Sequence, residues 1–185
     1  MTKKIFIIGV LAIFSCKESP KKEIVEVNVQ QSGSPVYDDE KKEGDEAQKW
    51  LELHIQNYFA GDLGKLDQMM KDMTTKDYYE YKGDAMNVDM DVDGSLTQKE
   101  FEEKWKGKFD TSKAGIGTGF LITGQDWDTI KITKCKLLSQ KENEFVFDVV
   151  LSDNSHQLNY PITVKVIKKD HQFFIADVLQ EDIQP

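Results

Sequence analysis

The chain has 185 residues, which is room for one ordinary domain and a short appendage. Its formal net charge of −9 at pH 7 argues against nucleic acid as a partner, because an acidic surface repels phosphate backbones and the sequence contains no basic stripe. Hydrophobic residues make up 39% of the chain and aromatic residues 10%, which is enough for a packed core and excludes disorder along the whole length.

The N-terminal stretch MTKKIFIIGVLAIFSC predicts an export signal. Lys3 and Lys4 precede an apolar run over 5–14, which is too short to span a bilayer but has the length of a signal-peptide core. Ser15 and Cys16 then follow, and the pattern resembles a bacterial lipoprotein signal. The resemblance implies that residues 1–15 are removed, that Cys16 is lipidated, and that the protein is anchored to an envelope membrane, with the outer membrane expected. An ordinary secretory signal or an N-terminal anchor is the alternative.

Residues 16–44 are rich in proline, glycine and mixed charges, a composition typical of a flexible linker. From residue 45 onward the pattern changes, and a single domain is expected over 45–185. Apolar residues recur at helical spacing over 46–60, which predicts an amphipathic helix. A second helix is predicted over 62–73, with Asp62 as its cap.

The acidic stretch DMDVDGSLTQKE, residues 89–100, is the strongest candidate for a metal site. Its spacing resembles a single EF-hand-type DxDxDG loop, in which oxygen ligands surround Ca²⁺ and a glycine makes the sharp turn, here Gly94. The resemblance implies one calcium ion. It also implies six ligands, which are Asp89, Asp91, Asp93, Ser95, Thr97 and Glu100. Ser95 would bind through its carbonyl, and Thr97 would bind directly or through water.

A second interpretation of the same stretch needs no metal. Thr97 and Glu100 also have the spacing of a capping box, which would start a helix. That alternative leaves the three aspartates unexplained, and carboxylates held this close repel one another without a cation. The flanks agree only in part with an EF-hand. Phe101, Trp105 and Phe109 share a helical face after the loop, but Gly83 interrupts the helix expected before it.

The glycine-rich stretch over 114–124 does not match a nucleotide-binding motif, and it predicts a turn leading into a short strand over 120–123. Strands with short polar turns are predicted over 129–138, 144–152, 160–168 and 171–179. Strands so connected form an antiparallel meander, because a parallel pair needs a long crossover.

Helices followed by such a meander predict an α+β fold, with N-terminal helices packed on a curved antiparallel sheet. The order of elements over roughly 45–182 resembles the NTF2-like (cystatin-like cone) superfamily. In that family the space between sheet and helices often forms a pocket, which binding proteins and enzymes both use.

The sequence favours a lipid-anchored, non-enzymatic envelope protein that binds one calcium ion. An NTF2-like pocket for a small ligand or for catalysis, with calcium stabilising only its rim, is the alternative, and a protein-interaction or inhibitor module is a further one. Cys135 lies in a strand-like run and predicts a buried structural thiol. None of the histidines, His54, His156 and His171, has a carboxylate pattern that indicates catalysis.

Overall fold

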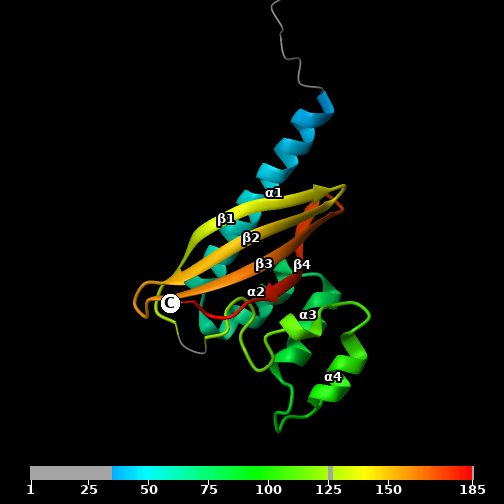
Figure 1. Cartoon of the computed structure of the whole chain (residues 1–185), viewed down its shortest axis with the longest axis vertical. Coiled ribbons are helices and arrows are strands. Elements are labelled where there is room, and N and C mark those ends of the chain that lie inside the picture. Colours follow the sequence, from blue (N-terminus) through cyan, green and yellow to red (C-terminus); the bar gives the residue numbers. More distant parts are fainter. Residues whose placement is uncertain (1–34, 125–126, 185) are drawn as a thin grey trace, which may run out of the picture. The chain divides into compact units, whose positions relative to one another are not determined.

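The computed structural model describes residues 35–124 and 127–184, so the predicted signal peptide, Cys16 and the first part of the predicted linker lie outside the described residues. Over the described residues, four α-helices are followed by four β-strands (Figure 1). The predicted α+β class is therefore confirmed. No helix in the described ranges is long and apolar enough to cross a bilayer.

The strands form one open antiparallel sheet in the order β1-β2-β3-β4, as the short turns predicted. Their bounds lie within three residues of the predicted ones. They are β1 Ile130–Lys141, β2 Glu144–Asp153, β3 Leu158–Lys169 and β4 Gln172–Gln180.

Helix α1 spans Pro35–Ala60, so it begins before the predicted start at residue 46, and 35–44 of the predicted linker is helical. Proline is well tolerated in the first turn of a helix, which suits a start at this residue. Gly44 is buried where α1 meets β1. A Cβ at this position would lie 2.8 Å from Oε1 of Gln140 and 2.9 Å from Cδ2 of Leu137. The glycine allows close packing of helix on strand and is not a sign of a flexible linker.

The core lies between the helices and one face of the sheet. Alternate residues of β2 and β3 point into it, as the period of a strand requires. Each large side chain buried in this way contributes about 1.5–3 kcal/mol. The members from β2, β3 and α1 are Phe145, Phe147, Val149, Leu151, Tyr160, Ile162, Val164, Val166, Ala47, Leu51, Ile55 and Tyr58.

The remaining helices lie beyond the β4 side of the sheet in Figure 1. A 3-10 turn, η1 (Leu63–Lys65), and α2 (Leu66–Met73) occupy the predicted 62–73 helix. The carboxylate of Asp62 accepts the N–H of Gly64 at 2.9 Å, so the predicted cap is confirmed. Helices α3 (Lys76–Met86) and α4 (Gln98–Trp105) follow and flank the acidic loop.

An aromatic cluster joins α3 to α4 and to the segment after it. The ring of Tyr81 stacks on Phe109, with centroids 4.2 Å apart, and on Phe101, with centroids 5.4 Å apart. Trp105 meets Tyr81 edge-on at 5.6 Å. Such pairs contribute about 0.5–1.5 kcal/mol beyond their buried area. The face shared by Phe101, Trp105 and Phe109 thus holds both ends of the acidic loop in place.

Residues 120–123 do not form the short strand that the sequence predicted. Phe120, Leu121 and Ile122 are all buried, whereas a half-buried strand would bury alternate side chains. The side-chain amide of Gln180 donates to the carbonyl of Gly119 at 2.9 Å and to that of Phe120 at 3.3 Å. These side-chain contacts take the place of strand pairing.

Candidate functional site

The loop between α3 and α4 is closed by backbone hydrogen bonds. The N–H of Asp89 donates to the carbonyl of Leu96 at 2.9 Å, and the N–H of Ser95 donates to the carbonyl of Val92 at 3.1 Å. Gly94 has φ +84°, a conformation that glycine adopts without strain. The loop therefore turns at Gly94 through a left-handed backbone conformation.

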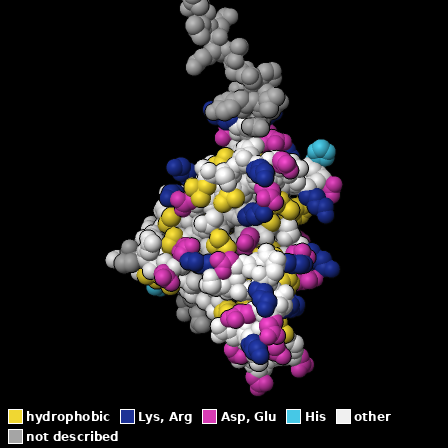
Figure 2. All heavy atoms as spheres, turned by 45° about the vertical axis from the view of Figure 1, so that its right-hand side comes forward, with side chains coloured by type: hydrophobic (Ala, Val, Ile, Leu, Met, Phe, Trp, Pro, Cys, Tyr) yellow, Lys and Arg dark blue, Asp and Glu magenta, His cyan; other side chains and the backbone are white. Residues whose placement is uncertain are grey.

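The aspartates of this loop have no basic partner among the described residues. Asp89, Asp91 and Asp93 are exposed, and none lies within 4 Å of a lysine or histidine nitrogen of the described residues. Figure 2 shows acidic side chains at the lower end of the domain, the end at which α4 lies in Figure 1. Three carboxylates lie two residues apart along this loop, and none of them has a basic partner among the described residues.

Glu100 is engaged elsewhere. Its Oε2 accepts the N–H of Thr97 at 2.9 Å and the hydroxyl of Thr97 at 2.7 Å, while the N–H of Glu100 donates to the Thr97 hydroxyl at 3.3 Å. These bonds form a capping box at the start of α4, as the metal-free interpretation predicted for these two residues. The pKa of the Glu100 carboxyl is lowered by these bonds. The bond from the backbone N–H of Thr97 has the larger effect, and the bond from its hydroxyl has the smaller one.

The predicted ligands are not gathered around one point. Among residues 35–124 and 127–184, no three carboxylate, imidazole or thiol groups lie close enough together to hold a metal ion. Calcium binding would require Glu100 to release Thr97 and the three aspartates to turn inward. The donor set fits calcium in its chemistry, and the rearrangement concerns side chains on an exposed loop.

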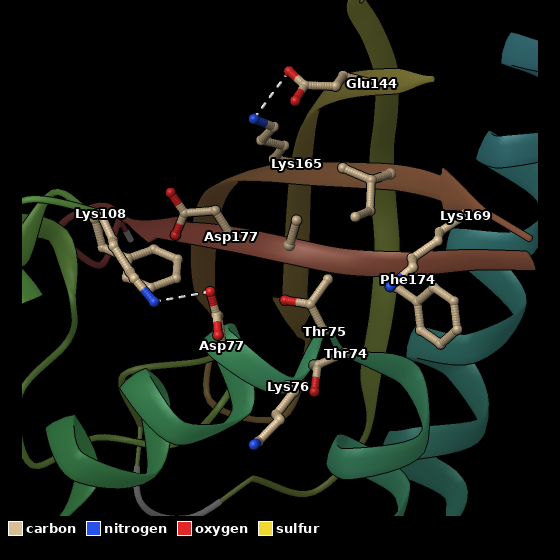
Figure 3. Close-up of a pocket in the computed structure, with 13 residues that line it drawn as sticks. Thr74, Thr75, Lys76, Asp77, Lys108, Glu144, Lys165, Lys169, Phe174 and Asp177 are labelled. Carbon is tan, nitrogen blue, oxygen red and sulfur yellow. Dashed lines mark hydrogen bonds and ion pairs between the residues drawn. The ribbon is translucent and has the colours of Figure 1, made fainter. Parts of the chain in front are cut away.

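A pocket of about 700 Å³ lies elsewhere, between the outward-facing side chains of β3 and β4 and the N-terminal turn of α3 (Figure 3). No pattern in the sequence predicted it, because its residues come from segments far apart in the chain. Its volume is in the range of small-molecule sites. Its lining is Thr74, Thr75, Lys76, Asp77, Lys108, Phe109, Glu144, Lys165, Ile167, Lys169, Phe174, Ala176 and Asp177.

A β-bulge directs Asp177 into this pocket. Lys165 pairs with Asp177 across the strands, but the next residue, Val166, pairs with Ile175, so Ala176 is the extra residue. Burial raises the pKa of the Asp177 carboxyl to about 6, against the opposing effect of the Val178 N–H. Its Oδ1 is buried without a hydrogen-bond partner among the described residues. Such a group is uncommon in folded proteins and marks this end of the pocket.

A second buried charge is Lys82 of α3, whose side chain is 0% exposed. Its ammonium donates to the carbonyl of Ala114 at 2.7 Å, to that of Gly115 at 3.2 Å and to Oε1 of Gln180 at 3.3 Å. Three donors thus meet three acceptors, and burial lowers the pKa of Lys82 to about 7. The contacts hold the 114–120 segment between α3 and β4.

Cys135 is less buried than the sequence predicted, and two of the histidines have local contacts. Cys135 is partly buried, and its pKa is raised to about 12, chiefly by burial, which makes the thiol unreactive at neutral pH. His156 contacts the buried Asp153 at 2.9 Å in the turn between β2 and β3. His54 lies 2.7 Å from the carbonyl of Trp50 one helical turn earlier.

No protein-family model, no curated protein and no solved structure matches the chain. The function is therefore inferred from the residues and their contacts.

Proposed function

We propose that the chain is an exported, lipid-anchored binding protein without an enzymatic role, and that its loop 89–100 binds one calcium ion. The observation that carries the calcium proposal is a set of three exposed aspartates that have no basic partner in the described part of the chain, beside a turn with Gly94 at φ +84°. Calcium would draw the aspartates inward and tie the end of α3 to the start of α4. Releasing the Glu100 cap costs about 1 kcal/mol, which suits a weak, extracellular-type site.

Calcium should raise the melting temperature of the full-length chain, because an ion that binds only the folded form stabilises it by mass action. The rise should begin at about 10⁻⁴–10⁻³ M calcium, the range of extracellular calcium modules. Magnesium should substitute poorly, since it demands a tighter octahedral shell. The measurement is thermal unfolding followed during a titration with each ion.

Glu100→Gln separates metal binding from helix capping. Glutamine can also close a capping box, so the melting temperature without calcium should change little. The response to calcium should be largely lost, because one charge and the bidentate ligand are removed. Glu103→Gln is the matched control, since it removes an exposed carboxylate from the same helix. A melting temperature that stays flat to tens of millimolar calcium, or an equal response in both variants, would refute the site.

The lipid anchor has its own test. Cys16→Ser should release the protein from membranes, because the serine hydroxyl cannot carry the thioether-linked lipid. Cell fractionation of the two forms measures this directly. A Cys16→Ser protein that has lost its signal and still sediments with membranes would contradict the lipoprotein assignment.

A second candidate function is binding of a small ligand in a pocket, and the pocket in Figure 3 favours it. This pocket lies on the outward side of β3 and β4, whereas the space between the sheet and α1 is occupied by apolar side chains. A ligand would therefore bind outside the core and not inside the cone that the NTF2-like resemblance implied.

A further inference from the structure

The charges in the pocket are paired except at two positions. Lys108 lies 3.0 Å from Asp77, and Lys165 lies 3.0 Å from Glu144. Asp177 and Lys169, by contrast, have no opposite charge within 4 Å among the described residues. In Figure 3, Asp177 lies beside Lys108 at one end of the pocket, and Lys169 lies beside Phe174 at the other.

The surface between these two ends is apolar and follows the strands. Ile167, Phe174 and Ala176 contribute it, from neighbouring strands of the sheet. Lys165 is the cross-strand partner of Asp177, and Lys169 lies four residues further along β3. At a rise of about 3.3 Å per residue, the backbone positions of the two ends are about 13 Å apart along the strand.

We propose that this pocket binds a short apolar peptide of three or four residues, with its N-terminal ammonium at Asp177 and its C-terminal carboxylate at Lys169. An extended chain of this length spans about 10–14 Å, which matches the distance along β3 between the backbone positions of the two ends. Its side chains would cover the apolar surface between them. This proposal goes beyond calcium binding and does not depend on it.

The surroundings of Asp177 support an ammonium as its partner. Burial disfavours the charged carboxylate, and an opposite charge at hydrogen-bond distance reverses that effect. The side chains that face the Asp177 carboxylate do not neutralise its charge. Lys165 is paired with Glu144, and the facing tyrosines, whose pKa values are raised, are uncharged. These neighbours are Tyr78 and Tyr81 of α3, Lys165 of β3, Lys108, and Asp110 before the 3-10 turn η2 (Thr111–Lys113).

Binding should therefore depend on pH in one direction. A bound ammonium favours the ionised form of Asp177, whose pKa in the free protein is about 6. Peptide binding should thus weaken as the pH falls below that value. A ligand that carried only an anion would show the opposite dependence, because protonation of Asp177 makes the pocket more positive.

The test uses trialanine, N-acetyl-trialanine and trialanine amide, titrated into the full-length chain and followed by calorimetry or by NMR shifts. Blocking either end should weaken binding by about fivefold, the effect of losing one partly exposed ion pair. The Asp177→Asn variant should bind trialanine and N-acetyl-trialanine equally well. The Lys169→Gln variant should bind trialanine and trialanine amide equally well. Lys136→Gln, on the exposed side of β1 and outside the pocket, should behave as the parent.

Equal binding of the free and blocked peptides would overturn the proposal, as would binding that strengthens below about pH 6 or no binding at tens of millimolar. If Asp177→Asn does not fold, which circular dichroism would reveal, the blocked peptides and the pH series on the parent chain still decide the question. A calcium response without peptide binding would refute this inference alone and leave the proposed calcium site intact.

Discussion

Between pH 7 and pH 9 the free energy of unfolding should rise by about 2–3 kcal/mol more in the parent chain than in a Lys82→Met variant. The cause is the buried ammonium of Lys82, which has three oxygen acceptors but no carboxylate partner among the described residues. Burial without a counter-charge disfavours the charged form and lowers the pKa of Lys82 from 10.5 to about 7.

The direction follows from proton linkage. At any pH between about 7 and 10.5, the unfolded chain holds a proton on Lys82 that the folded chain has partly released. Stability therefore rises with pH in this window, by about 1.4 kcal/mol per pH unit at the steepest. Below pH 7 the folded protein carries the full penalty of the buried charge.

Urea unfolding at several pH values measures the effect. Comparing variant with parent cancels the contributions of all other titrating groups. Lys82→Met leaves the carbonyl of Ala114 without its lysine donor, so some loss of stability is expected at every pH. Lys76→Met is the matched control, because this lysine lies on the same helix with its side chain 87% exposed, and it should keep the parent slope. A Lys82→Met variant with the parent pH dependence would contradict the assignment.

The sheet could be predicted from the sequence because its signals are local. The alternation of apolar and polar residues in EFVFDVVLS and YPITVKVIK indicates which face of each strand is buried. The short turns allow only an antiparallel arrangement of consecutive strands. The strand bounds shifted by a few residues, because hydrogen bonding continues past the last apolar side chain. That continuation depends on the neighbouring strand and leaves no mark in the sequence.

The start of α1 and the irregular 120–123 segment could not be predicted in the same way. Gly44 lowers helix propensity, but a Cβ at this position would come within 3 Å of the side chains of Gln140 and Leu137 of β1, so a glycine suits the close packing of helix on strand. Similarly, FLIT has the composition of a strand, but the side-chain amide of Gln180, about sixty residues away, donates to the carbonyls of Gly119 and Phe120 where a strand partner would otherwise bond. Both outcomes depend on contacts between distant segments.

The site residues divide along the same line. The spacing of residues predicted both the acidic loop and the capping box. Spacing alone does not say whether Glu100 serves as a metal ligand or as part of the capping box. Lys82 had a signal that was missed, since Tyr78, Tyr81, Lys82 and Ala85 have the i, i+3, i+4, i+7 spacing of a buried helix face. Asp177 had none, because the bulge at Ala176 that reorients it arises from pairing between β3 and β4.

Gly115→Ala should lower the free energy of unfolding by about 3 kcal/mol or more, through strain and lost hydrogen bonds together. Gly115 has φ +59°, a left-handed conformation that alanine adopts only at a cost. A Cβ here would also lie 1.4 Å from Oε1 of Gln180, so that side chain must leave its place. Gln180 accepts from Lys82 and Thr118 and donates to two carbonyls of the 119–120 segment, and all four contacts depend on its position.

Gly117→Ala separates the two contributions. Gly117 also has a left-handed backbone, at φ +68°, but an added Cβ would meet no atom of the described residues within 4 Å. Its substitution should therefore cost only the conformational strain, about 1 kcal/mol. Urea unfolding of both variants gives the comparison, and the difference between them measures the contribution of the Gln180 contacts. If the two substitutions lower stability equally, the Gln180 contacts contribute little, and the 114–120 segment is held by its buried apolar side chains instead.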